Sequence, residues 1–477
     1  EIPKRDWSSD VCSSDLWIVR MLRDDRFGRY FADRLARSLT GVEQGPLFIF
    51  RRDRLRDWLA QQLLADAAWG QMTRDLIAAE GLWTDQPAAN FLTIARMENE
   101  ELDETKLAGR TVRAFLGQRI DCAQCHDHPF DHWKQHEFAG LAAHFGQLDL
   151  PGPLSGVTGV RDNRKLNFEV EDRNTLEKKV VEPAVPFGKQ WEPSEGSRRE
   201  RLAAWVTHPE NRRLERAITN RVWGLLFGRP WIEPVDDLPD PPGEEIAGPT
   251  VEGAKHPKAS KPGESDLLDV LGADFREHGY DLRSLIEVIV ASKPFLLDSK
   301  SETDDPQQLD RMKQSFAIFP LTRVRPEQMI GSMLQASSLK TIDQNSHLIS
   351  RFLKLTRSND FVKEYGDLGD NELEDRAGTI PQALLRMNGQ LTRDAADASP
   401  FTAPGRLASM AKDDRHCLEL CFLTCLTRRP TDDELTALLS LLSNERPNGN
   451  DNFVSRGNRI EDIYWILFNS PEFAWNH

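Results

Sequence analysis

Apolar residues recur three or four positions apart along most of the chain, a spacing that places them on one stripe of an α-helix. The pattern begins at Trp17, continues through residues such as Phe31, Leu35 and Leu39, and returns as far as Phe468. Strand-like runs are confined to 166–170 and 179–185, on either side of a polar turn. We therefore expect a mainly α-helical protein with one small β-hairpin insert.

These patterns divide the 477 residues into parts. The pattern predicts a multi-helix N-terminal domain over residues 17–147, a β-rich insert or linker over residues 148–196, and a larger helical C-terminal domain over residues 197–477. Chains of this length usually form about two to three domains, which agrees with this division. Residues 237–266 interrupt the last part with six prolines, four glycines and a basic tract. We expect a long surface loop there, because this composition does not support a packed core.

The first sixteen residues differ from the rest. Lys4–Leu16 repeats Ser-Ser-Asp around Cys12 and joins the helical pattern abruptly at Trp17. This segment resembles a translated sequencing adapter, so we expect residues 1–16 to be an artefact in which Cys12 has no role. On this interpretation the N-terminal domain is truncated and any secretion signal is missing.

Composition and motifs exclude several classes of function. The net charge of −15 and the pI near 5.3 disfavour binding to nucleic acid or to an anionic membrane. No run of about 18 apolar residues is present, so we expect no transmembrane segment. The GxSxG, HExxH and phosphate-loop motifs are absent, and hydrolase chemistry has no support. Whether the protein is an enzyme stays open.

The strongest chemical motif is the pentapeptide Cys122-Ala-Gln-Cys125-His126. Two thiols at this spacing can each form a thioether with a porphyrin vinyl group, and the adjacent imidazole can bind the iron. With six Cys and eleven His in the chain, a random sequence of the same length and composition would contain this pattern with a probability of roughly 0.002. The predicted helix 104–120 would deliver the cysteines, and Pro129 would lie in the first turn of the helix that follows. The motif favours covalently attached haem c.

Two alternatives stay open at this motif. Zinc could use Cys122, Cys125, His126 and His128, although structural zinc sites usually take ligand pairs from two separated turns. A redox or structural thiol pair would leave His126 unexplained. The rival to a cytochrome is thus a non-redox binding or scaffold protein with a structural zinc at CxxCHxH.

The second axial ligand is not decided by the sequence. The next methionine after the motif is Met312, so histidine is the other option. His128 could ligate a metal, bind a haem propionate or cap a helix. His132, His136 and His144 fall on one face of the predicted helix, opposite its apolar stripe, which favours a solvated polar face. An iron with an open site would permit small-ligand or peroxide chemistry.

Other clusters favour ordinary structural roles. Cys417, Cys421 and Cys425 share one face of a predicted helix, which indicates core packing rather than an iron–sulfur cluster. A stripe of aromatic residues at helical spacing is predicted to lie in the core as well. The acidic residues that follow it are predicted to lie on a solvated surface loop. The aromatic residues are Trp223, Phe227 and Trp231, and the acidic residues are Glu233, Asp236, Asp237 and Asp240.

Several stretches of the sequence together resemble a known family. They are CAQCHDHPFDHW at 122–133, NRVWGLLFGRPWIEPVDDL at 220–238, RVRPEQM at 323–329, MNGQL at 387–391, LTRRPTDDEL at 426–435 and NSPEFAWNH at 469–477. The chain resembles secreted proteins of Planctomycetes and Verrucomicrobia that join a cytochrome-associated domain of unknown function, of the CxxCH-HPF type, to a planctomycete-specific C-terminal domain of unknown function. The resemblance covers nearly all of residues 17–477.

The resemblance implies a c-type cytochrome-like protein outside the cytoplasm, periplasmic or secreted, with Cys122, Cys125 and His126 as the attachment site. His128 is the next position of the family pattern. Implied partners are a redox protein or a cell-surface assembly, in the setting of polysaccharide breakdown. The chain departs from the family in its long 237–266 loop and its short front end. We expect electron transfer through the haem, with a docking or scaffold role for the C-terminal domain.

Overall fold

The structure is a computed structural model that describes residues 13–41, 52–82, 85–96, 102–129, 131–150, 159–171, 175–244, 266–301, 303–340, 373, 380–443 and 456–476. It contains two compact units. Unit 1 comprises residues 1–297 with 369–374, and unit 2 comprises residues 298–368 with 375–477. Residues 1–12 of the predicted artefact and 245–265 of the predicted loop lie outside the described residues.

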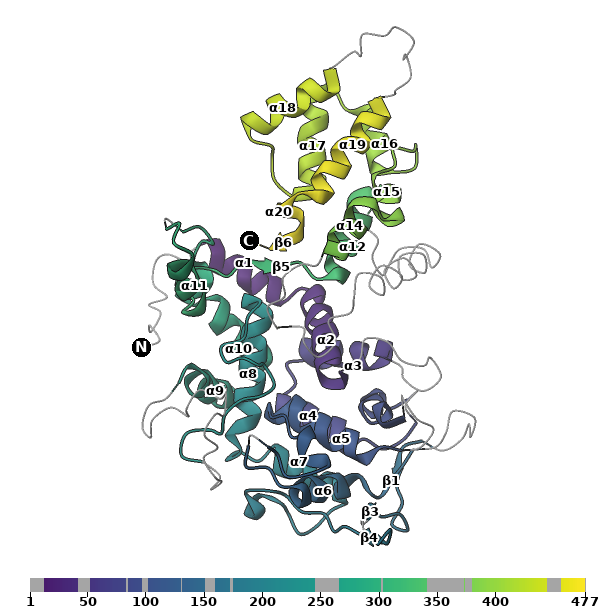
Figure 1. Cartoon of the computed structure of the whole chain (residues 1–477), viewed down its shortest axis with the longest axis vertical. Helices are drawn as coiled ribbons and strands as arrows, with labels where there is room; N and C mark the ends of the chain where they lie inside the picture. The colour runs from purple at the N-terminus through teal and green to yellow at the C-terminus, as the bar shows by residue number, and fades with distance from the viewer. Residues whose placement is uncertain are drawn as a thin grey trace. The chain divides into compact units, whose positions relative to one another are not determined.

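Unit 1 begins with four α-helices and a 3₁₀ helix (Figure 1). They are α1 (Ser13–Leu22), α2 (Asp25–Thr40), α3 (Arg52–Leu64) and α4 (Trp69–Ile77), followed by the 3₁₀ helix η1 (Pro87–Arg96). Asp24 caps the start of α2, and Gly41 in the left-handed conformation ends it. Phe31, Leu35 and Leu39 are buried, and α2 packs against α3. The amphipathic interpretation of this region is confirmed.

The next helices differ from the prediction at their ends. The elements are α5 (Glu104–Thr111), the π turn η2 (Val112–Leu116), the 3₁₀ turn η3 (Asp121–Gln124), α6 (Gln135–Ala142) and the 3₁₀ turn η4 (Ala143–Phe145). The helix predicted to reach Ile120 ends at Gly117, whose φ of 64° closes it. The following helix begins at Gln135, so Pro129 does not lie in its first turn. A short irregular link therefore leads from Gly117 to the cysteines.

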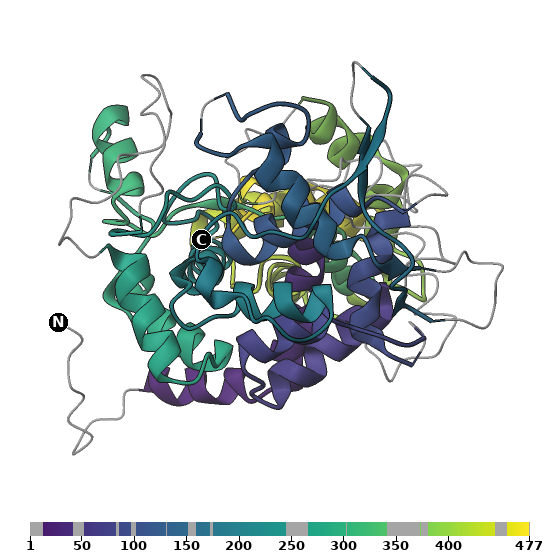
Figure 2. The same cartoon turned by 90° about the horizontal axis from the view of Figure 1, so that it is seen from below.

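The predicted β insert is present and small. Strands β1 (Leu148–Asp149) and β2 (Arg161–Asp162) pair antiparallel, as do β3 (Glu169–Glu171) and β4 (Lys178–Val180). In the β3–β4 hairpin Val170 lies opposite Lys179. The hairpin extends away from the helices of unit 1 in two views (Figures 1 and 2). The 3₁₀ turn η5 (Lys189–Trp191) then leads back to the helices.

Unit 1 is completed by α7 (Arg198–Val206), α8 (Arg212–Phe227), α9 (Leu267–Glu277), α10 (Leu282–Val290) and the 3₁₀ turn η6 (Lys293–Leu296). α7 packs against α4, and α8 packs against both η2 and α9. These helices come from the region that the sequence assigned to a C-terminal domain beginning at residue 197. Their packing against the N-terminal helices places the division between the compact units after Leu297.

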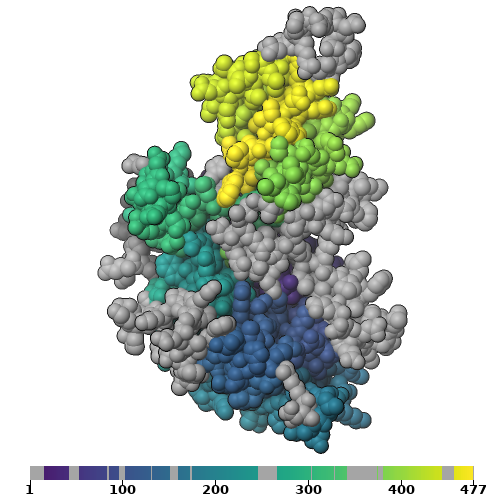
Figure 3. All heavy atoms as spheres, viewed as in Figure 1, coloured from purple at the N-terminus to yellow at the C-terminus, as the bar shows by residue number. Residues whose placement is uncertain are grey.

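The described residues of unit 2 form a helical body with one two-stranded pair. Its elements are α11 (Pro306–Gln314), β5 (Thr322–Arg323), α12 (Pro326–Ser337), α14 (Ile380–Asn388), α15 (Gln390–Ala396), α16 (Ala403–Met410), α17 (Asp414–Leu426), α18 (Asp432–Ser443), α19 (Arg456–Asn469), α20 (Pro471–Ala474) and β6 (Trp475–Asn476). β5 and β6 pair antiparallel. The helices after residue 403 form one closely packed body in the space-filling view (Figure 3).

The core of unit 2 contains the three regularly spaced thiols. Cys417, Cys421 and Cys425 are buried on α17 and pack in one apolar cluster with residues of α19 such as Ile460 and Phe468. Burial raises the pKa of the Cys425 thiol well above its ordinary value. The prediction of core packing is confirmed for these cysteines.

The fold is mainly α-helical, as the sequence predicts. The described helices include none whose length and apolar character would let it span a membrane.

Candidate functional site

The CxxCH motif lies on one exposed turn of unit 1. Cys122 and Cys125 belong to or directly follow η3, are exposed and form no disulfide. His126 is exposed as well. Ala123, between the cysteines, is fully buried and anchors the turn to the protein. The structure thus brings together the three residues that the sequence assigned to haem attachment.

Side chains from α5 and η2 hold the start of this turn. Asp121 pairs with Arg113 at 2.9 Å, and the Gln124 side chain amide donates to Thr105 Oγ1 at 2.9 Å. The Ala123 N–H donates to the Ile120 carbonyl at 2.9 Å. These contacts fix the backbone of the turn while both thiols stay accessible to solvent.

The residues at the start of α6 hold the end of the turn. The Gln135 side chain amide donates to the Cys125 carbonyl at 3.1 Å, and its backbone N–H donates to Asp127 Oδ1 at 3.0 Å. Lys134 Nζ lies 3.1 Å from Asp127 Oδ2. The Gln135 N–H and the Lys134 ammonium lower the pKa of the Asp127 carboxyl. Asp127 therefore stays ionised and ties the motif to α6.

The His126 imidazole is oriented by its own neighbour. Nδ1 lies 2.7 Å from the Asp127 carbonyl oxygen. Because a carbonyl oxygen can only accept, Nδ1 carries the hydrogen in this contact, and Nε2 is the nitrogen that bears the lone pair in the neutral imidazole. A backbone carbonyl on one ring nitrogen is the usual arrangement for a histidine that binds a metal through the other.

The following histidines have three different environments. His128 is half-buried, and its backbone N–H donates to the Trp133 carbonyl at 2.8 Å. His132 packs its ring on Trp133 with the centroids 4.4 Å apart, and its Nδ1 lies 2.7 Å from Asp131 Oδ1. His132 Nε2 is buried and has no hydrogen-bond partner among the described residues. His136 is exposed.

The prediction of one solvated histidine face is wrong for His132 and His144. α6 begins only at Gln135, so His132 lies before the helix. His144 is fully buried: Nδ1 lies 3.1 Å from the Gly140 carbonyl, and Nε2 lies 3.2 Å from Glu192 Oε1. Both nitrogens of His144 are therefore engaged within the protein, which removes it from the candidate axial ligands.

The donor set of this turn fits covalently attached haem. Two exposed thiols and an imidazole nitrogen with a free lone pair are the groups that such an attachment needs. Within the described part of 102–150, no large apolar side chain is exposed beside them. The side chains that form hydrogen bonds or ion pairs at the turn, such as those of Gln124, Asp127 and Gln135, are polar or charged. The side chains that such an attachment needs are therefore present on this turn.

A zinc site places a stronger demand on the same segment. Zinc needs four side chains such as Cys122, Cys125, His126 and His128 to converge at bonding distance. In the part of the chain that the structure describes, no three or more His, Cys, Asp or Glu side chains are arranged to hold a metal ion.

The expectation of a solvated acidic loop near residue 236 is wrong for two of its members. Asp236 is buried and pairs with Arg119 at 2.6 Å and Arg113 at 3.4 Å. Asp240 pairs with Arg213 at 2.7 Å. Asp236 thus helps to hold the segment that leads into the cysteine turn. Its hydrogen-bond partner Arg119 is 117 positions away, so local sequence carries no signal for the pair.

The expected aromatic core is confirmed for two of its three residues. Trp223 and Phe227 are buried on α8 with their rings stacked at 4.3 Å. Trp231 is 38% exposed and meets Trp223 edge to face. Trp223 therefore packs against both of the other rings.

Comparison with known families agrees with the resemblance drawn from the motifs. Residues 5–149 match PSCyt2, a protein of unknown function (DUF1549). Residues 198–250 and 253–442 match PSD1, a protein of unknown function (DUF1553), over more than half of the chain. The chain belongs to the PSCyt2–PSD1 family. The cysteine turn of this PSCyt2–PSD1 protein lies within its PSCyt2 match. No curated protein and no solved structure matches the chain.

Proposed function

We propose that this PSCyt2–PSD1 protein is a c-type cytochrome-like protein that transfers electrons outside the cytoplasm. The observation that carries the proposal is the exposed turn on which Cys122, Cys125 and His126 lie together with both thiols free. A haem bound there supplies one-electron transfer. An exposed turn is also open to a partner protein, which electron transfer requires.

Each residue of the turn has a defined part in the proposal. Cys122 and Cys125 tether the cofactor through thioether bonds, and His126 offers Nε2 to the iron. The Asp127 carbonyl holds His126 Nδ1–H, which fixes the ring and makes Nε2 more basic. Gln135 holds the Cys125 carbonyl and so limits movement of the second tether. His128, the next position of the family pattern, is proposed to tune the site or ligate the iron.

The proposed partners follow from the family resemblance. They are a redox protein or a cell-surface assembly, with association to polysaccharide as a further part of the proposal. The acidic net charge of the chain favours a partner with a complementary basic patch. Placement outside the cytoplasm belongs to the same proposal.

The test is expression of the chain behind a secretion signal in a host with the machinery for c-type haem attachment. We expect haem to stay with the polypeptide on a denaturing gel and to give a pyridine haemochrome spectrum. The double variant Cys122→Ala with Cys125→Ala should lose both signals. Cys12→Ala, which removes a thiol outside the turn, is the matched control and should keep them.

Other outcomes of this experiment decide between the rivals. A colourless protein with stoichiometric zinc would overturn the cytochrome proposal in favour of a structural metal at Cys122, Cys125, His126 and His128. If haem is attached, carbon monoxide or cyanide binding distinguishes an open iron site from one with two protein ligands. The variant His128→Ala then shows whether His128 supplies the second axial ligand, because its loss would change the binding of carbon monoxide or cyanide.

A further inference from the structure

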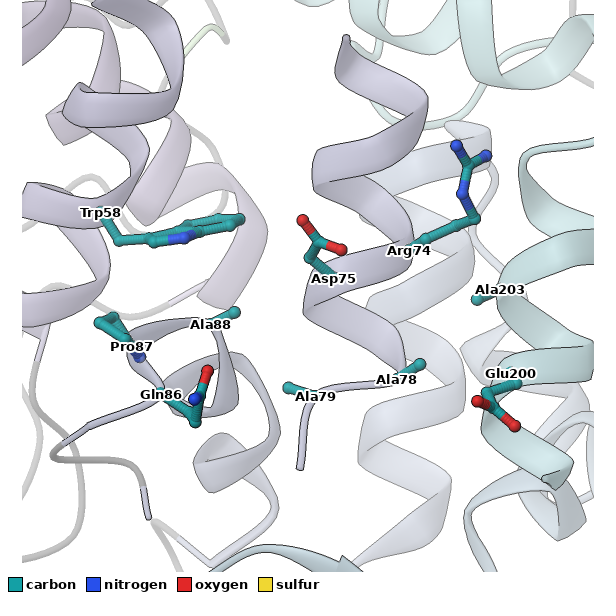
Figure 4. Close-up of a pocket in the computed structure, with 10 residues that line it drawn as sticks. All are labelled: Trp58, Arg74, Asp75, Ala78, Ala79, Gln86, Pro87, Ala88, Glu200 and Ala203. Carbon is teal, nitrogen blue, oxygen red and sulfur yellow. The ribbon is translucent and has the colours of Figure 1, made fainter. Parts of the chain in front are cut away.

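A cavity of about 420 Å³ opens in unit 1 between α3, α4, η1 and α7. The cavity is open because four of its lining residues are alanines, where larger side chains would fill it: Ala78, Ala79, Ala88 and Ala203. Polar and aromatic residues form the remaining walls (Figure 4). The lining residues that matter here are Trp58, Arg74, Asp75, Gln86, Pro87 and Glu200.

The two sides of α4 differ in the groups they present to this cavity. On one side Trp58 of α3 and Asp75 of α4 point toward one another, with Pro87, Ala88 and Gln86 along the adjoining wall (Figure 4). Arg74 lies on the other side of α4 with its guanidinium turned away from Trp58 (Figure 4). The chamber beside Trp58 therefore holds an indole, a carboxylate and an amide, and no cationic lining residue points into it.

Hydrogen bonds fix this division. Arg74 Nη1 donates to Thr207 Oγ1 at 3.0 Å, and Arg74 Nη2 donates to Gln71 Oε1 at 2.8 Å. Gln71 Nε2 in turn donates to Asp75 Oδ1 at 2.7 Å. Gln71 thus separates the guanidinium from the carboxylate and orients both. Asp75 Oδ2 has no hydrogen-bond partner among the described residues.

We propose that this chamber binds a small organic cation, an alkylammonium or alkylguanidinium group. The negative face of an indole attracts a cation, and a carboxylate with a free oxygen supplies a charge-assisted hydrogen bond. The alanines and Pro87 accommodate the apolar part of the ligand, and the Gln86 amide oxygen can accept a further N–H. An anionic ligand is disfavoured by Asp75 and by Glu200 on the far side of α4.

The test compares two probes of the same shape on the full chain. Butylguanidinium carries the charge, and butylurea is its neutral counterpart. We expect isothermal titration calorimetry at low salt to give saturable binding of butylguanidinium at least ten times tighter than that of butylurea. Asp75→Asn should remove the preference while keeping the hydrogen bond from Gln71, and Trp58→Ala should weaken both probes.

The controls keep the result interpretable. Glu177→Gln removes one negative charge from the exposed β3–β4 hairpin and should leave the preference intact. Circular dichroism checks that each variant is folded. Equal affinity for the two probes, a preference that survives Asp75→Asn, or no saturable binding of either probe overturns the proposal. Tight binding of a neutral sugar such as glucose that Asp75→Asn does not change would assign the chamber to another ligand class.

Discussion

Glu215 is a carboxyl group that the packing of α8 and α9 removes almost entirely from solvent. Only 3% of its side chain is exposed, and Arg276 is its ion-pair partner at 3.3 Å. Gly272 of α9 makes room for it, since a Cβ at Gly272 would lie 3.0 Å from the Glu215 Cγ. Burial raises the pKa of Glu215 to about 7, although Arg276 and Arg212 act in the opposite direction. The folded protein therefore holds a proton here that an unfolded chain releases.

This raised pKa predicts how stability changes with pH. Between the ordinary value of 4.5 and about 7, the folded state binds more protons than the unfolded state, so the free energy of unfolding falls as pH rises through that window. Glu215→Gln cannot ionise and should remove this fall. Above pH 7 we expect the free energy of unfolding of Glu215→Gln to exceed that of the unsubstituted protein by up to about 3 kcal/mol, at 1.36 kcal/mol for each pKa unit. Urea unfolding at pH 5, 6, 7 and 8 measures it.

The matched control for Glu215→Gln is Glu195→Gln, which changes the same charge on an exposed residue. This variant should keep the pH dependence of the natural residue at 215. If Glu215→Gln lowers stability equally at all four pH values, the carboxylate is a stabilising partner of Arg276 and the prediction is wrong.

At the residue scale, the sequence predicts that the residues of the CxxCH motif lie together, but it does not predict which charged side chains are buried. Cys122, Cys125 and His126 lie together on one exposed turn because the motif is local. The burial of His144 and Asp236 could not be predicted, because their partners Glu192 and Arg119 are 48 and 117 positions away. Burial alone would raise the pKa of Glu192, but the hydrogen bonds and charges of His144 and Arg201 outweigh it, so that pKa lies below its ordinary value.

Helix ends determine how well whole elements could be predicted. α7 and α9 each begin directly after a side chain that caps the helix, Ser197 and Asp266. The apolar pattern after α5 runs past the true end of the helix. Gly117 ends it there, since glycine adopts the left-handed conformation readily. The apolar residues beyond it are buried by tertiary packing instead.

Gly117 lies in a left-handed and crowded position just before the cysteine turn. Its φ is 64°, and a Cβ there would lie 3.1 Å from both Ala217 Cβ and Leu238 Cδ1. Its carbonyl accepts the Leu238 N–H at 2.7 Å. Gly117→Ala should therefore cost about 1 kcal/mol for the left-handed conformation and a further 1 to 3 kcal/mol for crowding. Urea unfolding of the variant measures the sum.

Gly279 is the matched control for this substitution. It follows α9 with a φ of 69°, and a Cβ there would meet nothing within 4 Å. Gly279→Ala should cost only the conformational part. Equal losses for the two variants would show that Ala217 and Leu238 move aside, and that the close packing at Gly117 does not hold the link to the cysteine turn.

At the scale of the whole chain, family boundaries and compact units divide the protein differently. The PSD1 match runs from 198 to 442 and so includes α7–α10 of unit 1 as well as most of unit 2. Periodicity predicts helices but not which of them share a core, and so it placed one boundary at 197. Each unit has an apolar core of its own, around residues such as Leu268 in unit 1 and Tyr464 in unit 2.

Separate cores predict separate unfolding transitions. Phe275 of α9 and Phe422 of α17 are both buried, one in each unit. Replacing either by leucine should cost about 1 to 2 kcal/mol through lost contacts and a small cavity, which lowers the midpoint by a few degrees for units of this size. Differential scanning calorimetry should show two transitions, with Phe275→Leu shifting one and Phe422→Leu the other. A single transition that both variants shift equally would mean that the units unfold as one cooperative body.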